Sequence, residues 1–218
     1  MHLLIFDLDG TLVDSKQDLI DSVNATRGYM NMAPLPGPTV AKYVGRGAMA
    51  LIQSALGEAA PAEQVEKAHA FFIQYYGEHM LDKTVLYDGV RESLDALRER
   101  GHLLAVLTNK PVRFSERMMD RLGLGRHFLR IYGGNSFEPK KKPDPVGIHA
   151  LISESSIPGE RTIMVGDSSV DIRTARNAGV RSCGVTWGFQ PETFEQEPPD
   201  FTIDHMRQLH EYLLANPR

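Results

Sequence analysis

The chain has 218 residues and a formal net charge of −4 at pH 7, with 24 Lys and Arg against 28 Asp and Glu. A mildly acidic chain lacks the basic footprint that nucleic-acid backbones require, so nucleic acid is not expected as a partner. The sequence also has no apolar run of about 18 residues, the length that a membrane-spanning helix needs, so no membrane partner is expected.

A chain of this length suits one core domain with a sizeable insertion, or two small domains. It passes from Met1 almost directly into an apolar segment, so no signal peptide is expected. Its single cysteine, Cys183, cannot form an internal disulfide and lies in an apolar stretch typical of a small core residue. These features together favour a soluble, cytoplasmic protein.

The first predicted element is a short apolar strand, Leu3–Phe6, of the kind that is buried in parallel sheets. It leads directly to Asp7 and Asp9, which are followed by Gly10 and Thr11. Unpaired carboxylates at the end of a buried strand are costly, so a positive group is expected beside them, and a hard divalent cation is the simplest candidate. A solvated turn is the alternative meaning of such a string on its own.

Residues 15–82 are predicted to be helical, without a convincing strand. Apolar residues recur at helical spacing over residues 15–32 and 62–80, and two shorter helices are predicted at residues 39–44 and 48–56. The segment rich in Pro and Gly at residues 33–38 ends the first helix. We expect this block to be a small all-helical cap domain, inserted into a core domain made of residues 1–14 and 83–218.

After residue 83, buried strands and helices alternate along the chain. Strands are predicted at residues 103–107, 162–165 and 181–186, with weaker ones within 127–132 and at 201–203. Helices are predicted at residues 90–100, 111–122, 145–153 and 205–214. A further helix is predicted after Ser168, ending at Ala178. This alternation predicts an α/β fold, with a Rossmann-like parallel sheet core and helices on both faces.

Polar residues directly follow three of these strands. Besides Asp7 and Asp9, the pair Thr108 and Asn109 follows the second strand, and Asp167 follows the strand at residues 162–165. Because ligands of parallel α/β sheets bind at the carboxyl ends of the strands, we expect these residues to form one site.

Each polar cluster also has an ordinary explanation. Thr108 and Asn109 suit a helix cap, and Asp167 with Asp171 would complement the dipole at a helix start. The basic run that ends at Lys142 is typical of a solvated surface, although the prolines that follow stiffen the chain there. Four unrelated coincidences in the right order would be needed for all of these explanations to hold together.

The arrangement resembles the four motifs of the haloacid dehalogenase (HAD) superfamily of aspartate-dependent phosphatases. The match consists of Asp7-x-Asp9, Thr108, Lys142 and Gly166-Asp167-x-x-x-Asp171, and it covers nearly the whole chain. Within the superfamily, the sequence is most similar to phosphoglycolate phosphatases. The strings that carry this similarity include Tyr43-Val-Gly-Arg-Gly47, Thr108-Asn-Lys-Pro111, Gly133-Gly-Asn-Ser-Phe137 and Lys142-Pro-Asp-Pro145.

The resemblance implies a Mg²⁺-dependent phosphomonoester hydrolase that forms an aspartyl-phosphate intermediate on Asp7. It implies that Asp9 protonates the leaving oxygen and then activates water, and that Lys142 balances the charge of Asp7 and the phosphoryl group. The implied Mg²⁺ ligands are the carboxylates of Asp7 and Asp167 and the main-chain carbonyl of Asp9. Mg²⁺ held in this way would neutralise the phosphate, which is the main task in hydrolysing a phosphomonoester.

Further residues are assigned around this centre by the same resemblance. Thr108 and the backbone of Asn109 are expected to hold phosphate oxygens. Asp171 is expected to order either the water shell of the metal or the lysine, and Ser168 is placed with it behind the ligands. Dehalogenases of the superfamily lack an acid equivalent to Asp9 and need no metal, so the sequence points away from that branch.

In the cap, Gly45, Arg46 and Gly47 are the candidate substrate-binding residues. Free amides at a helix start attract anions, glycines let a ligand approach the backbone, and a guanidinium can grip a carboxylate with two hydrogen bonds. We therefore expect this loop to hold the carboxylate of 2-phosphoglycolate or a similar small phosphorylated metabolite. An exposed turn is the alternative role for Arg46.

Other functions are still open at this stage. A pyrophosphatase or a β-phosphoglucomutase-like phosphotransferase would use the same motifs. A non-catalytic binding module on the same fold is a further alternative, disfavoured by the intact acidic residues. Monomer and dimer are both compatible with the sequence.

Overall fold

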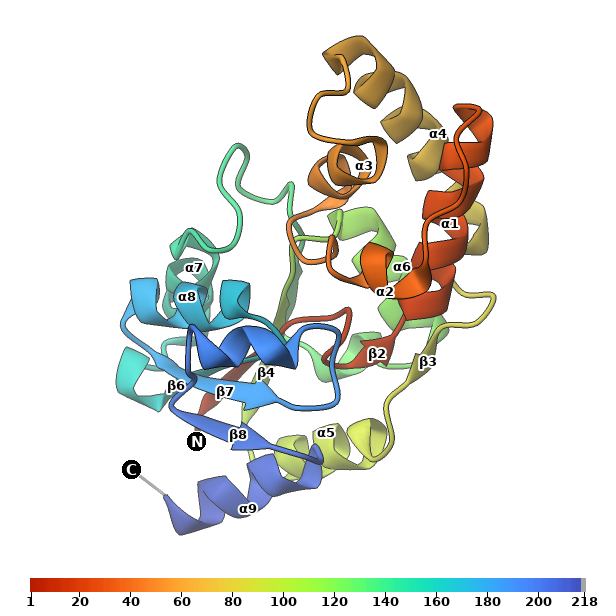
Figure 1. Cartoon of the computed structure of the whole chain (residues 1–218). Helices are drawn as coiled ribbons and strands as arrows, with labels where there is room; N and C mark the ends of the chain where they lie inside the picture. The colour runs from red at the N-terminus through yellow and green to blue at the C-terminus, as the bar shows by residue number, and fades with distance from the viewer. Residues whose placement is uncertain (217–218) are drawn as a thin grey trace.

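The structure, a computed structural model, describes residues 1–216 and is built around a six-stranded parallel sheet with the strand order β5-β4-β1-β6-β7-β8 (Figure 1). The strands are β1 (Leu3–Phe6), β4 (Leu103–Leu107), β5 (Arg130–Tyr132), β6 (Thr162–Gly166), β7 (Arg181–Val185) and β8 (Phe201–Ile203). The predicted α/β fold with a Rossmann-like parallel sheet is confirmed.

Helices cover both faces of the sheet because its strands are apolar on both sides. In β1, Leu3 and Ile5 belong to one hydrophobic cluster, whereas Leu4 and Phe6 belong to the other. The helices α7 (Val146–Ser155) and α8 (Ser169–Ala178) pack on the first face. The second face is covered by α5 (Val90–Glu99), α6 (Val112–Arg121) and α9 (Arg207–Ala215). Short 3₁₀ turns lie at Gly125–His127, Gly159–Arg161 and Pro191–Glu195.

Strand β1 lies in the middle of the sheet, between β4 and β6. The chain therefore crosses to one side of β1 to form β4 and to the other side to form β6. In α/β sheets such a reversal opens a crevice at the carboxyl ends of the strands, where ligands bind. Cys183 is fully buried in β7, as expected for a core residue.

Four helices make up residues 15–82, which we call the cap, and Figure 1 shows them to one side of the sheet. They are α1 (Lys16–Tyr29), α2 (Gly37–Ala41), α3 (Ala48–Leu56) and α4 (Ala62–His79). The cap has its own packing, chiefly of α1 against α4 and of α3 against α4. No strand lies between residues 16 and 82 in this part of the described chain, as the sequence indicated. The division into two domains stays a prediction.

The chain enters and leaves the cap side by side. The two-residue strands β2 (Val13–Asp14) and β3 (Val85–Leu86) pair antiparallel, an element that the sequence did not predict. Nearby, the buried carboxylate of Asp18 accepts hydrogen bonds from the amide of Lys83 at 3.0 Å and from the amide and hydroxyl of Thr84 at 2.9 and 2.7 Å. Asp18 thus ties the first cap helix to the returning chain.

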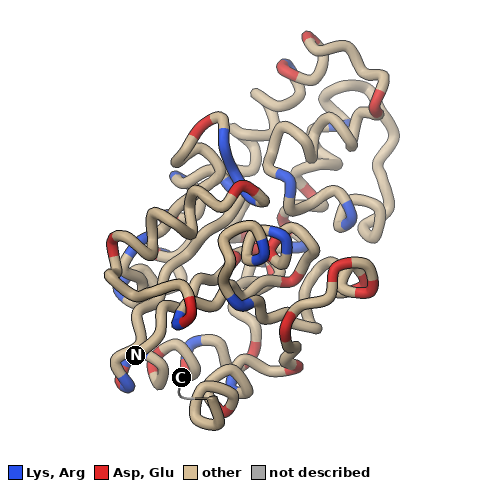
Figure 2. The backbone as a smooth tube through the Cα atoms, turned by 90° about the vertical axis from the view of Figure 1, so that its left-hand side faces the viewer, with Lys and Arg blue, Asp and Glu red and all other residues tan. Residues whose placement is uncertain are grey.

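Charged residues of both signs are spread along the chain, in the cap as well as in the core (Figure 2). Across residues 1–216, no helix is both long enough and apolar enough to cross a membrane.

Candidate active site

Three polar side chains stand at the ends of neighbouring parallel strands. Asp7 directly follows β1, Thr108 follows β4, and Asp167 follows β6, and all three are buried. Parallel pairing of β1 with both neighbours brings the three strand ends to the same level. The sheet therefore gathers residues from distant parts of the sequence at one edge.

Lys142 reaches the same point from the loop between β5 and α7. Its Nζ lies 2.9 Å from Oδ1 of Asp7 and 2.6 Å from Oδ1 of Asp171, and its side chain is 1% exposed. The loop is fixed because Nδ2 of Asn109 donates a hydrogen bond of 2.9 Å to the carbonyl of Lys142. By contrast, the side chain of Lys140 in the same basic run is 60% exposed.

Asp171, in the first turn of α8, aims this lysine. Its Oδ2 accepts hydrogen bonds from the amide and the hydroxyl of Ser168, at 3.1 and 2.9 Å, while its Oδ1 contacts Lys142. Both oxygens of Asp171 thus have partners, and the residue has no exposed surface. Of the two roles that the resemblance allowed for Asp171, the hydrogen bonds support the ordering of the lysine.

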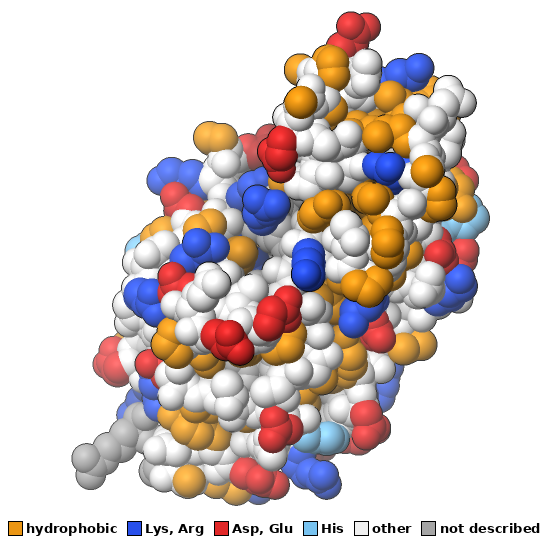
Figure 3. Space-filling view, in the orientation of Figure 1, with side chains coloured by type: hydrophobic (Ala, Val, Ile, Leu, Met, Phe, Trp, Pro, Cys, Tyr) orange, Lys and Arg blue, Asp and Glu red, His pale blue; other side chains and the backbone are white. Residues whose placement is uncertain are grey.

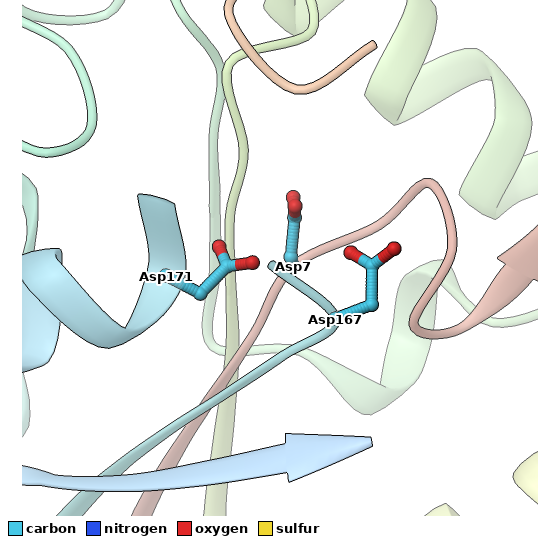
Figure 4. Close-up of side chains that lie close together, drawn as sticks. All are labelled: Asp7, Asp167 and Asp171. Atoms are coloured by element: carbon cyan, nitrogen blue, oxygen red, sulfur yellow. The ribbon is translucent and has the colours of Figure 1, made fainter. Parts of the chain in front are cut away.

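The carboxyl groups of Asp7, Asp167 and Asp171 turn toward a common space, with one oxygen from each within 4.8 Å of the others (Figure 4). One ammonium, that of Lys142, contacts two of these three carboxyl groups, those of Asp7 and Asp171. Burial, partly offset by Lys142, raises the pKa of Asp7 to about 6. Burial, together with the charges of Asp171 and Asp7, raises the pKa of Asp167 well above its usual range.

This excess of buried acid is the test of whether a cation fits. A buried carboxyl group whose pKa rises has too little positive charge nearby to offset its burial, and a bound cation adds that charge. The donors are oxygens alone, which suits Mg²⁺ rather than Zn²⁺. The residues present therefore fit the divalent cation expected from the sequence.

The backbone closes tightly around Asp167. Gly10 has a φ of +81°, and a Cβ at this position would lie 2.2 Å from Oδ2 of Asp167. From the other side, the amide of Phe189 donates a hydrogen bond of 2.6 Å to the same oxygen. Glycine is required at position 10 for both its backbone conformation and this close approach.

Asp9 lies beside the acidic cluster but has separate partners. The hydroxyl of Ser15 donates a hydrogen bond of 2.5 Å to its Oδ1. The Nζ of Lys110 lies 2.9 Å from each carboxylate oxygen, and it also contacts the hydroxyl of Tyr76 in the cap. Burial alone would lower the pKa of Lys110, but the Asp9 carboxylate and Tyr76 together raise it above its usual value.

A cavity lies between these residues and the cap. Its empty volume is about 650 Å³, which includes space open to solvent. From the core, Asp7, Asp9, Thr108 and Asp167 line it. The cap contributes apolar residues and glycines, namely Leu19, Val44, Gly45, Gly47, Ala48, Leu51 and Phe72. Hydrophobic side chains also gather on the outer face of the cap that Figure 3 shows.

The cap loop closes over the core through its carbonyl groups. Asn109 Nδ2 donates to the carbonyl of Gly45 and Lys141 Nζ to that of Arg46, each at 2.9 Å. Gln190 Nε2 donates to the carbonyls of Ala41 and Val44 at 3.0 and 2.9 Å. These contacts hold the cap in a closed position over the strand ends.

The predicted cap residues occupy different places. Gly45 and Gly47 line the cavity. The side chain of Arg46 is exposed and its guanidinium contacts the hydroxyl of Ser54 at 3.4 Å, so the structure does not bring it to the cavity wall. The predicted core residues, in contrast, all lie within this one site.

Sequence reasoning did not assign roles to Lys110, Tyr76, Phe189 or Gln190. Lys110 stood inside the string Thr108-Asn-Lys-Pro111, and its place directly after a strand-end motif was a usable signal. The helical spacing of apolar residues over 62–80 indicated only that Tyr76 packs in the core. Phe189 and Gln190 lie in a loop after β7 whose path the sequence does not indicate.

Residues 4–185 match the family of haloacid dehalogenase-like hydrolases. The chain therefore belongs to this family, which confirms the resemblance found in the motifs, and it is a hydrolase of the phosphatase type.

Among curated relatives, a phosphoglycolate phosphatase of Pseudomonas fluorescens is 37% identical over 215 residues, covering 95% of this chain and 78% of the relative. A phosphoglycolate phosphatase of Agrobacterium fabrum is 38% identical over 210 residues, covering 95% and 90%. Among solved structures, a predicted phosphoglycolate phosphatase from Haemophilus somnus matches with a TM-score of 0.90 and 30% identity, covering 97% of each chain.

Proposed function

We propose that the chain is a Mg²⁺-dependent phosphomonoester hydrolase that acts through an aspartyl-phosphate on Asp7. The observation that carries this proposal is the buried group of Asp7, Asp167 and Asp171 with Lys142 among them, at the carboxyl ends of the strands. Hydrolysis of a phosphate dianion needs a nucleophile, positive charge that neutralises the dianion, and oxygens that hold a metal. The side chains proposed for these roles lie together here.

The carboxylates of Asp7 and Asp167 and the main-chain carbonyl of Asp9 would hold Mg²⁺. When bound, Mg²⁺ withdraws charge from the phosphoryl oxygens and orients them. The pairing of Lys142 with Asp7 supports its role in balancing charge on the nucleophile. Thr108 and the Asn109 backbone would hold phosphate oxygens, since Thr108 is buried at the strand end next to Asp7.

The reaction has two steps. In the first, a carboxylate oxygen of Asp7 attacks phosphorus, the bond to the leaving oxygen breaks, and that oxygen takes a proton from Asp9. In the second, water attacks phosphorus and gives its proton to Asp9 while the bond to Asp7 breaks, and inorganic phosphate is released. Closure of the cap would exclude bulk water from the first step.

We take 2-phosphoglycolate as the first substrate to test, because the relatives named above carry that activity in their names. Its carboxylate would lie at the cap loop, where Gly45 and Gly47 line the cavity before the start of α3. Arg46 would join it only after its side chain leaves Ser54 and turns inward. This proposal also includes three expectations from the sequence: residues 15–82 form a separate cap domain, nucleic acid is not a partner, and the protein is cytoplasmic.

The test is phosphate release by the purified chain from 2-phosphoglycolate, ethyl phosphate, pyrophosphate and glucose 1-phosphate. We expect turnover with Mg²⁺, none in EDTA, and at least about a 10³-fold loss in kcat for Asp7→Asn. Mass spectrometry of rapidly quenched enzyme should find a phosphoryl group on the peptide that contains Asp7. Full activity in EDTA, or normal turnover by Asp7→Asn, would contradict the proposal.

The same panel separates the alternatives. A preference for pyrophosphate would assign a pyrophosphatase, and isomerisation of a sugar phosphate without phosphate release would assign a phosphotransferase. To test the cap loop, Arg46→Ala should lower kcat/KM by about 10-fold for 2-phosphoglycolate, as expected when charged hydrogen bonds are lost. Ethyl phosphate, which lacks the carboxylate, should be affected much less, and equal losses would remove Arg46 from the substrate site.

A further inference from the structure

Lys110 carries a buried ammonium that the mechanism above does not use. It directly follows Asn109 at the end of β4, lines the cavity, and its side chain is 4% exposed. Its Nζ lies 2.9 Å from both oxygens of Asp9 and contacts the hydroxyl of Tyr76 as well. A lysine ammonium has three hydrogens to donate, so these three acceptors use all of them.

This saturation decides between two possible roles for Lys110. A lysine that binds the carboxylate of a substrate needs a free donor that points into the cavity. Here every donor is engaged by the protein itself, and two of the three are engaged by the residue proposed as general acid and base. Lys110 is therefore placed to act on Asp9 rather than on the substrate.

Tyr76 holds Lys110 from the cap side. It lies on α4, is 1% exposed, and its ring packs edge-on against Phe114 of α6 at a centroid distance of 5.5 Å. The ammonium of Lys110 also lies 4.5 Å from the centre of the Tyr76 ring, a cation–π distance. The lysine is thus clamped between the core acid and a cap residue whose own position is fixed by packing.

We propose that Lys110, held by Tyr76, is a positioning residue that fixes the carboxylate of Asp9 for proton transfer in both steps of the reaction. The proposal rests on the proposed function, in which Asp9 is the acid and the base. A carboxylate on a short side chain can rotate, and proton transfer requires that one of its oxygens points to the leaving group and then to the attacking water. Two ion contacts to one ammonium define that orientation, and an error of about 1 Å in such a group can cost about 10²-fold in rate.

The dependence of the rate on the leaving group tests this role. In the first step, an alkoxide must take a proton from Asp9 as it leaves, whereas p-nitrophenolate leaves without one. We therefore expect Lys110→Met to lower kcat/KM by about 10²-fold for both 2-phosphoglycolate and ethyl phosphate. For p-nitrophenyl phosphate, kcat/KM should fall far less.

The second step gives an independent readout on the same variant. With p-nitrophenyl phosphate, Lys110→Met should form the aspartyl-phosphate readily but hydrolyse it slowly, because water activation also needs Asp9. A burst of about one p-nitrophenol per enzyme should precede a slow steady state, as for other covalent intermediates that accumulate. Tyr76→Phe, which removes one acceptor and keeps the ring, should show the same pattern with smaller losses, and it serves if Lys110→Met does not fold.

Two controls separate the explanations. Lys140→Met removes an exposed lysine of the same charge and should leave all three substrates unaffected. Asp9→Asn should reproduce the leaving-group pattern if Asp9 is the acid, and a flat response in Asp9→Asn would show that the proposed function itself is wrong. If Asp9→Asn shows the pattern and Lys110→Met does not, only the positioning role fails.

Three results with Lys110→Met would overturn the inference. A loss for 2-phosphoglycolate but not for ethyl phosphate would make Lys110 a ligand of the substrate carboxylate. Equal losses for all three substrates would reduce it to a general charge in the site. Unchanged kinetics for all three would make the contact with Asp9 purely structural.

Discussion

Removing divalent cations from the protein should make its stability depend on pH through Asp7. Burial raises the pKa of Asp7 in the folded chain to about 6, from its usual value of 3.8. Between these two values the folded chain binds the proton more tightly than the unfolded chain, so its free energy of unfolding falls as the pH rises through this window. At about 1.36 kcal/mol per pKa unit, the total is about 3 kcal/mol.

The assay is urea unfolding at several pH values between 4 and 7 in EDTA, for the wild type and Asp7→Asn. Titrating groups remote from Asp7 contribute equally to both proteins, so the difference between their free energies of unfolding reports Asp7 together with Asp167, whose pKa depends on the charge of Asp7. We expect the stability of the wild type relative to the variant to fall by most of this total, about 2.4 kcal/mol, from pH 4 to pH 7. Mg²⁺ should restore more stability to the wild type than to the variant.

Asp88→Asn is the matched control, because the side chain of Asp88 is fully exposed and the substitution should not alter the pH dependence. The reasoning would be refuted if the difference between the wild type and Asp7→Asn stayed constant from pH 4 to pH 7. It would also be refuted if the relative stability of the wild type rose over this range, since that would mean that Lys142 outweighs burial at Asp7.

Three further substitutions test other parts of the structure. In steady-state assays, Lys142→Ala should lower kcat at least about 100-fold because it removes the buried ammonium. Lys140→Ala, at an exposed position, should change kcat less than about 2-fold. Similar losses for the two variants would indicate a general basic patch. Gly10→Ala should lower the free energy of unfolding in urea by at least about 1 kcal/mol more than Gly101→Ala, because Gly101 has a similar φ but open space around it. Equal losses would mean that backbone strain alone, and not the contact with Asp167, destabilises Gly10→Ala. Asp18→Ala should cost about 2–3 kcal/mol in the same unfolding assay, because buried donors lose their acceptor, and a loss below about 0.5 kcal/mol would mean that water replaces it.

The sequence was sufficient to predict the sheet and the core of the site because both follow from local patterns. A buried parallel strand is apolar on both faces, so segments such as Leu3–Phe6 and Leu103–Leu107 stand out, and they match the observed strands residue for residue. Polar residues directly after such strands must share one edge of the sheet. For this reason the sequence alone predicted that Asp7, Thr108 and Asp167 lie together.

The remaining features depend on contacts that no local pattern encodes. The strands β2 and β3 have two residues each and exist only because the cap linkers meet. The orientation of Arg46 depends on whether its side chain turns to Ser54 or to the cavity, and both are compatible with a Gly-Arg-Gly turn. The contact between Lys110 and Tyr76 joins residues 34 positions apart whose helix and strand end meet only when the cap is closed.

The burial of Cys183 has a practical consequence for following the cap in solution. Burial raises the pKa of its thiol, and thiols react as thiolates, so the native chain should be inert to thiol reagents while folded. Cysteines introduced at exposed positions, such as Met49→Cys on α3 of the cap and Lys140→Cys in the loop between β5 and α7, could therefore be labelled with a donor and an acceptor dye. The native Cys183 would not need to be replaced. Energy transfer between the two dyes would then report how often the cap opens.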